Sequence, residues 1–128
     1  MPIVANAQAA EIPWRPGYRR FTLAGKEQGV GCSASYSVLE PGAGAPLHRH
    51  DDLDEVLIVL EGTLDVCIGS ERHLVEADHT IAIPAGVPHA FVAVGASPAR
   101  FFAFLPKQGA AAATTYLDGD PPAGVDRR

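Results

Sequence analysis

The stretch from Gly42 to Gly62, GAGAPLHRHDDLDEVLIVLEG, decides the fold and holds most of the chemistry that the chain offers. Its Gly- and Pro-rich opening excludes a helix, so residues 47–50 are expected to be extended. Residues 55–60, EVLIVL, form a nearly continuous apolar run, which predicts a strand covered on both faces. The stretch therefore indicates two short strands around a polar turn.

Two histidines lie two residues apart at the end of the first of these strands. Side chains alternate along a strand, so His48 and His50 are expected to share one face while Arg49 points away from it. We expect the turn at residues 51–54 to close a hairpin that returns Glu55 to the two histidines. The pattern thus predicts a cluster of two imidazoles and one carboxylate.

A third histidine, His89, directly follows the rigid loop PAGVP at residues 84–88 and begins a later strand. Three imidazoles and one carboxylate suit a divalent first-row transition metal. Calcium, by contrast, prefers oxygen ligands throughout. His73 and His79 lie outside this spacing and are expected to be surface or structural residues.

The rest of the chain repeats the pattern of short apolar segments separated by turn residues. Its 13 glycines and 11 prolines exceed the usual combined share of about 12%. We count about eight to ten short strands at the spacing of roughly 8–12 residues that is typical of a sandwich or barrel. We therefore expect one barrel domain over residues 17–108, between an N-terminal arm at 1–16 and a C-terminal tail at 109–128. Alanine-rich residues 110–117 favour one or two helical turns by propensity.

Composition excludes several classes of protein. The 128 residues are the size of one domain, and a net charge of −5 without a basic stripe argues against a nucleic-acid partner. Apolar runs of at most about seven residues are too short for a membrane-spanning helix, which needs about 20. The two cysteines, Cys32 and Cys67, lack C-x-x-C spacing, and the N-terminus has no secretory pattern. We therefore expect a cytoplasmic protein.

Two motifs resemble those of the cupin family. The first motif is Gly42-x5-His48-x-His50-x4-Glu55-x6-Gly62, and the second is Pro84-x-Gly86-x2-His89. The second motif departs from the family pattern at its start, where Asp78 replaces a glycine, and at its end, where Ala93 replaces an asparagine. Because Asp tolerates turn conformations with positive φ, the fold should survive the first change. The second change leaves all four ligand positions intact.

The resemblance implies a fold and a site. It implies an all-β, antiparallel jelly-roll barrel in a single domain, with His48, His50, Glu55 and His89 binding one metal. Fe(II) is the favoured ion, with Mn, Ni, Zn or Cu as alternatives. The small quercetin-dioxygenase-like cupins are the most similar group, which implies a dioxygenase-type oxidoreductase acting on a small organic molecule, with Glu55 as a catalytic proton shuttle. The alternatives are a non-oxidative isomerase, decarboxylase or lyase, and a non-catalytic small-molecule-binding protein.

Aromatic side chains near these motifs are candidates for a substrate pocket. The candidates are Tyr36, Phe91, Phe102 and Phe104, each of which could equally belong to the core. Phe91 has the same strand parity as His89 and is the best of the four. The resemblance and the apolar residues of the arm, Trp14 among them, further suggest a homodimer through the arm or an outer sheet face.

Overall fold

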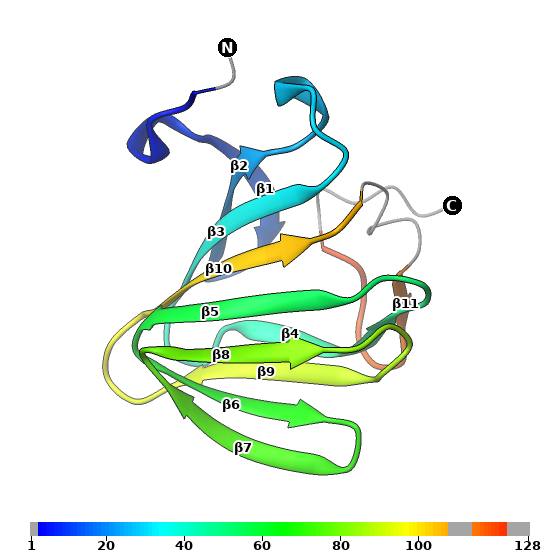
Figure 1. Ribbon diagram of the computed structural model, residues 1–128. Coiled ribbons are helices and arrows are strands. Elements are labelled where there is room, and N and C mark those ends of the chain that lie inside the picture. Colours follow the sequence, from blue (N-terminus) through cyan, green and yellow to red (C-terminus); the bar gives the residue numbers. More distant parts are fainter. Residues whose placement is uncertain (1–2, 108–113, 123–128) are drawn as a thin grey trace.

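The computed structural model describes residues 3–107 and 114–122 and consists of two antiparallel sheets (Figure 1). The six-stranded sheet has the order β1-β2-β3-β10-β5-β8, and the five-stranded sheet has the order β11-β4-β9-β6-β7. The strands of the first sheet are β1 (Ala10–Arg15), β2 (Tyr18–Ala24), β3 (Ser33–Leu39), β10 (Ala99–Leu105), β5 (Glu55–Glu61) and β8 (His79–Ile83). Those of the second are β11 (Thr114–Tyr116), β4 (Gly44–His50), β9 (His89–Val94), β6 (Thr63–Ile68) and β7 (Glu71–Glu76). The expected antiparallel jelly-roll barrel is confirmed.

Helical structure in the described part of the chain is limited to two 3₁₀ turns, η1 (Asn6–Gln8) and η2 (Lys26–Gln28). None of these described helices has the length and apolar character needed to cross a membrane. At the start of the second motif, Asp78 adopts a φ of 64°, as expected for a residue that stands where the family pattern has glycine.

The inner faces of the two sheets pack together to form the core. Alternating side chains point inward, so that Phe101, Ala103 and Leu105 of β10 are buried while Phe102 and Phe104 face outward. The other large, fully buried apolar side chains are Leu39, Leu53, Leu57, Val59, Leu64 and Val66.

Strand β5 differs from the expectation that both its faces are covered. Leu57 and Val59 are almost fully buried, but Ile58 is 41% exposed and Leu60 is 36% exposed. The outer face of the six-stranded sheet has no second layer among the described residues, so the continuous apolar run reflects an apolar outer surface. A run of apolar residues cannot by itself separate these two cases.

The C-terminal segment also differs from the expectation. Residues 114–116 form strand β11, which pairs with β4 so that Tyr116 lies opposite His48. Propensity favoured a helix because alanine dominates the stretch, but Thr-Thr-Tyr consists of β-formers that fit the edge of a sheet. The remainder of the expected helix, residues 110–113, lies outside the described residues.

The N-terminal arm contributes a strand to the barrel. Strand β1 pairs with β2 and forms one edge of the six-stranded sheet. Trp14 is half-buried and packs against the core, with its ring centroid 6.4 Å from that of Tyr18. The arm is therefore part of the barrel.

Candidate metal centre

Two strands from opposite sheets bring the first-motif side chains together. His48 and His50 point into the barrel from β4, whereas Glu55 is the first residue of β5 in the other sheet. The expected hairpin between them is wrong, because β4 pairs with β9 and β11 while β5 pairs with β8 and β10. Residues 51–54 instead cross from one sheet to the other, so the carboxylate faces the histidines across the interior.

A β-bulge aligns the two motifs. The register between β4 and β9 shifts between Ala45 and His48, and this shift places His48 directly opposite His89. The bulge contains Pro46, whose carbonyl oxygen accepts a hydrogen bond from His48 Nδ1 at 2.7 Å. Bulges are frequent next to functional sites because they re-aim a side chain without ending the sheet.

The four motif residues converge on one point. One ligand atom from each of His48, His50, Glu55 and His89 can be chosen so that all four lie within 4.8 Å of one another. All four side chains are nearly or fully buried, and His89 has no exposed surface. The structure therefore brings together all four residues that the sequence predicted as metal ligands. His73 and His79 are exposed and take no part in this cluster.

Hydrogen bonds fix the orientation of the imidazole rings. The carbonyl oxygens of Pro46 and Val87 accept bonds from Nδ1 of His48 and His89, at 2.7 and 2.9 Å. His50 Nδ1 lies 2.8 Å from the hydroxyl of Thr114 on β11. A ring that donates through Nδ1 keeps a lone pair on Nε2, which is the state that a metal requires.

These lone pairs face the carboxylate. Glu55 Oε1 lies 3.4 Å from His89 Nε2 and 3.1 Å from His50 Nε2. His89 Nε2 is buried and has no hydrogen-bond partner among the described residues. An imidazole nitrogen and a carboxylate oxygen this close in the interior repel each other as two acceptors unless a proton or a metal cation lies between them. Three imidazoles and one carboxylate, with the Nε2 atom of His89 left without a partner, therefore fit a divalent metal ion.

Burial and neighbouring charge set the protonation states of the cluster. Burial raises the pKa of Glu55, but its contacts with His50 and His89 outweigh this effect and lower the pKa to about 2. Burial, followed by the proximity of His89, lowers the pKa of His48 to about 4. A neutral imidazole beside an ionised carboxylate at neutral pH is ready to bind a cation without first losing a proton.

The pKa of His48 predicts an acid-sensitive window for the metal-free protein. Between pH 6.5 and 4 the unfolded chain protonates His48 and the folded chain does not, so the free energy of unfolding should fall as the pH is lowered. Urea unfolding at pH 7 and pH 5, followed by Trp14 fluorescence, measures this loss. His48→Asn should reduce the loss, and exposed His73→Asn should leave it unchanged. An equal loss in wild type and His48→Asn would contradict the prediction.

Three residues of the four-residue cluster, His48, His50 and Glu55, line a cavity of about 510 Å³. Phe91 lines this cavity, as its strand parity predicted, beside Tyr18 and Phe101. The expectation for Tyr36, Phe102 and Phe104 is corrected, because these three side chains lie on the outer face of the six-stranded sheet and do not line the cavity. Along β3 and β10 these three residues alternate with the buried ones, so they point to the outer face. Composition alone does not reveal which of the two alternating sets is buried.

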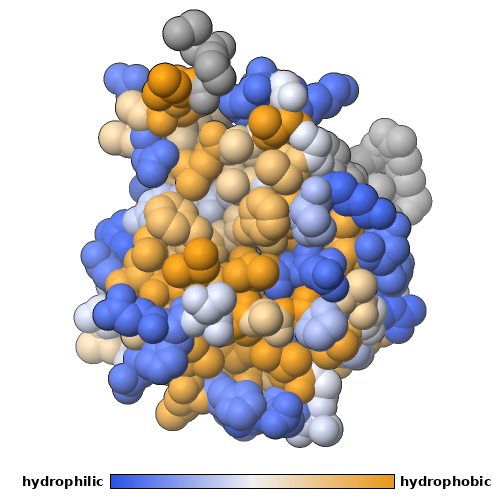
Figure 2. All heavy atoms as spheres, viewed as in Figure 1, coloured by the Kyte–Doolittle hydropathy of each residue, from blue (hydrophilic) through white to orange (hydrophobic). Residues whose placement is uncertain are grey.

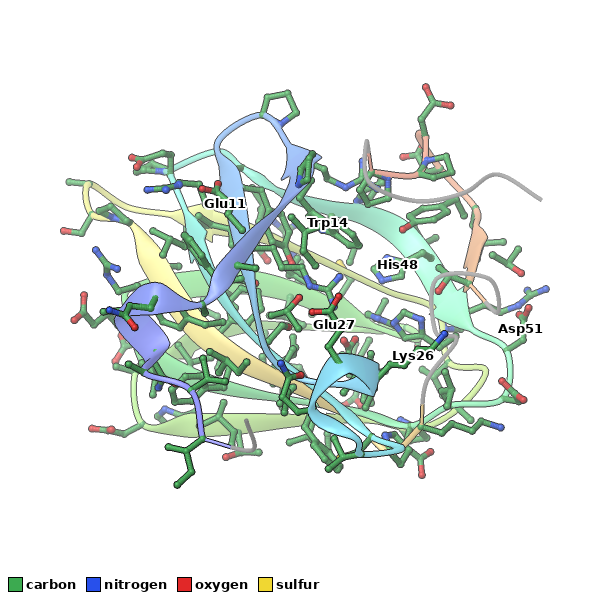
Figure 3. The ribbon with its side chains drawn as sticks, turned by 90° about the horizontal axis from the view of Figure 1, so that it is seen from above. Glu11, Trp14, Lys26, Glu27, His48 and Asp51 are labelled. Atoms are coloured by element: carbon green, nitrogen blue, oxygen red, sulfur yellow. The ribbon has the colours of Figure 1, made fainter. Side chains whose placement is uncertain are left out.

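Several cavity residues were not found from the sequence. Arg15 and Trp14 come from β1, Arg20 comes from β2, and Tyr116 comes from β11. In Figure 3, Trp14 and His48 lie around the same opening, with Lys26 and Glu27 projecting from η2 beside it. Their positions depend on how the two ends of the chain fold over the barrel, and no local motif marks them.

The acidic turn between the ligand strands connects the segments around the site. Asp51 accepts hydrogen bonds from Thr115 of β11 at 3.0 Å, and Asp54 accepts one from the backbone N–H of Ala85 at 2.9 Å. The Ala85 loop leads into His89, so this carboxylate helps to place the last ligand. The exposed acidic side chains of this turn thus anchor two neighbouring segments.

Comparison with known proteins identifies the domain type. The family model described as "Cupin domain" matches residues 35–105. This segment contains both motifs and all four clustered side chains, so more than half of the chain lies within the matched region.

Individual relatives share parts of the chain. Quercetin 2,3-dioxygenase of Bacillus subtilis (strain 168) is 40% identical over 50 residues, which are 39% of this chain and 15% of that protein. The polyketide synthase CurC of Streptomyces cyaneus is 28% identical over 100 residues, which are 76% of this chain and 65% of that protein. The chain thus spans less than two thirds of the length of either relative.

Solved structures share the fold. The polyketide cyclase RemF from Streptomyces resistomycificus has a TM-score of 0.77 with 19% identity, over 94% of this chain and 87% of that chain. At this identity the likeness shows the architecture alone.

Proposed function

The chain belongs to the cupin domain family, and we propose that it is a metal-dependent enzyme acting on a small organic molecule at the His48–His50–Glu55–His89 centre. The observation that carries this proposal is the set of inward-facing Nε2 atoms around Glu55 inside a cavity of about 510 Å³. A cavity of this size lies within the roughly 300–1,000 Å³ range of small-molecule sites.

We propose a dioxygenase-type reaction as the first candidate. A redox-active divalent metal bound at this centre would supply oxygen chemistry and Lewis acidity. The local similarity to quercetin 2,3-dioxygenase supports this choice. The protein itself contributes apolar side chains to the cavity wall, including Phe91 and Leu57, that limit the contact of water with the reacting groups.

We assign proton transfer to the carboxylate of Glu55. Its low pKa keeps it ionised while it contacts His50 and His89, so it can accept a proton only when these contacts loosen. Glu55→Gln should therefore lower kcat by about 100-fold or more. Metal content should fall less than in a histidine variant, because three imidazoles remain. Parallel kinetics and metal analysis check this, and wild-type kcat in Glu55→Gln would contradict the assignment.

A non-oxidative reaction is the second candidate, either the isomerase, decarboxylase or lyase chemistry expected from the sequence or a cyclisation. It is supported by the similarity to the polyketide synthase CurC over 76% of the chain, together with the fold shared with the polyketide cyclase RemF. In this case the metal-bound site would stabilise an enolate formed from the substrate, without consuming oxygen.

Oxygen uptake separates the candidates. Fe(II)-loaded protein should consume oxygen with quercetin as the trial substrate, and the His89→Ala variant should not. Conversion without oxygen uptake would favour the second candidate. Tight binding of the compound without any product would favour a binding protein and would contradict both enzymatic proposals.

We also propose that the protein works as a homodimer in the cytoplasm. The outer face of the six-stranded sheet supports a dimer, because Ile58 and Phe104 are 41% and 42% exposed there. Figure 2 shows hydrophobic residues gathered across the middle of the molecule, over β10 and β5 of Figure 1. The two cysteines, Cys32 and Cys67, lack C-x-x-C spacing, which suits a reducing compartment.

A single substitution that places a charged side chain on this face should disrupt the dimer, which tests the proposal. Sedimentation at tens of micromolar should give a dimer for the wild type and a monomer for Ile58→Arg. Exposed Leu74 on β7 lies in the other sheet, so Leu74→Arg serves as the control. A monomeric wild type would remove the proposal.

A further inference from the structure

The cavity wall is cationic although the chain as a whole is acidic. Among the described residues that line the cavity, the cationic ones are Arg15, Arg20, Lys26 and Lys107, and the anionic ones are Glu27 and Glu55. The chain has a net charge of −5. Lys107 pairs with Asp52 at 2.9 Å, and Glu55 faces the histidines. The charges of Lys26 and Glu27 cancel, so the two arginines remain as the net positive groups, on the part of the wall that β1 and β2 contribute.

Arg15 has two hydrogen-bond donors that the described protein does not use. Its Nε and Nη2 atoms are buried and have no hydrogen-bond partner among the described residues. Burying a charged donor without an acceptor is costly, and such a group in a cavity wall indicates an acceptor brought by a ligand. The side chain lines the same cavity as His48.

Other arginines of this protein show which acceptor these two atoms fit. Arg19 donates through Nε and Nη2 to the two carboxylate oxygens of Glu11, at 3.1 and 2.8 Å. Arg72 uses the same two atoms toward the carboxylate of Asp65. Arg15 leaves the same two atoms unpaired among the described residues, and this fork matches the two oxygens of a planar carboxylate.

One aromatic ring links Arg15 to the metal centre. The Arg15 guanidinium carbon lies 5.4 Å from the centroid of the Tyr116 ring. The same ring stacks on His48 with a centroid distance of 5.4 Å and an interplanar angle of 25°. A conjugated or aromatic molecule can therefore reach from the fork to the metal ligands along this wall. Trp14 lies nearby, with Arg20 over its ring at 4.2 Å.

We propose that the substrate is an aromatic or conjugated carboxylate, whose carboxylate group binds the Nε–Nη2 fork of Arg15 while its reacting part lies at the metal centre. This inference rests on the proposed function for the position of the reaction, but the carboxylate contact itself does not depend on turnover. Arg15 is a specificity-determining residue, and Arg20 adds positive charge to the same wall.

Binding of benzoate tests the proposal directly. Trp14 is the single tryptophan and lines the cavity, so quenching of its fluorescence reports occupancy in the protein as purified. Benzoate should bind saturably, and neutral benzamide should bind at least about tenfold more weakly. Arg15→Met should weaken benzoate binding about tenfold or more, and Arg15→Lys should weaken it less, because lysine keeps the charge and loses the fork.

Matched controls separate this result from folding and from the metal. Arg19→Met alters an exposed arginine in the next strand of the same hairpin and should bind benzoate as the wild type does. Metal content should be the same in all the Arg15 variants, so loss of metal in a histidine variant tests the proposed function separately. Unchanged benzoate affinity in Arg15→Met, equal affinity for benzamide, or tighter binding of phenyl phosphate than of benzoate would each overturn the proposal.

Discussion

The His89→Ala variant is expected to retain less than about one tenth of the wild-type metal content and to lose turnover. Replacing a partner that only orients a metal ligand already costs about 10–100-fold in affinity, and His89 is itself a ligand in our account. Its Nε2 is buried, lies 3.4 Å from Glu55 Oε1 and has no hydrogen-bond partner among the described residues. His48→Ala should behave in the same way, because His48 lies opposite His89 across β4 and β9.

Elemental analysis of protein purified without added metal or chelator measures this effect. His73→Ala and His79→Ala remove exposed imidazoles outside the cluster, so they should retain full metal content and activity. Circular dichroism on each variant separates loss of the ligand from loss of the fold. Full metal content in folded His89→Ala protein would show that the ion binds elsewhere.

Gly44→Ala is expected to destabilise the protein by at least about 3 kcal/mol, the upper end of the usual cost of overpacking. A Cβ at this position would overlap the carbonyl oxygen of Phe91 and would lie 2.7 Å from the Cα of Val92. Both obstacles belong to the backbone of β9, which cannot move aside as a flexible side chain can. Since Gly44 pairs with Val92 at one end of the β4–β9 ladder, relief of the clash must separate these strands.

The loss of stability should therefore be accompanied by a loss of metal affinity. Separation of β4 from β9 moves His48 away from His89, although neither ligand is changed. Thermal unfolding and metal titration of Gly44→Ala measure the two effects. At Gly31 no atom lies within 4 Å of an added Cβ and φ is not positive, so Gly31→Ala should have the wild-type stability. Equal melting temperatures for the two variants would show that the β4–β9 contact is not limiting.

The motifs predicted which four side chains converge better than they predicted the path of the chain. Strand parity was sufficient to place His48 and His50 on one face, because it depends only on alternation along one strand. Parity does not say which sheet a strand joins, so the crossing to Glu55 was mistaken for a hairpin. The same limit applies to Phe102 and Phe104, since choosing the inner face of β10 requires the complete sheet order.

The wall of the cavity could not be predicted from local sequence. Arg15 and Tyr116 are separated by most of the chain and meet only because β1 and β11 lie at the edges of different sheets. The β-propensity of the Thr-Thr-Tyr segment in β11 was the one local indication of a strand there. The neighbouring alanines favoured a helix over the same stretch, so the strand was not predicted. Long-range contacts of this kind depend on the finished fold, whereas the metal motif depends on spacing within two short segments.

X-ray absorption spectroscopy of the zinc-loaded protein tests the central claim most directly. We predict one zinc ion per chain, bound by three histidine nitrogens at about 2.0–2.1 Å together with carboxylate or water oxygen. The histidine signal should lose one nitrogen in any His48, His50 or His89 variant that still holds zinc. A zinc environment of sulfur or of oxygen alone, or three imidazoles that persist in His89→Ala, would contradict the account.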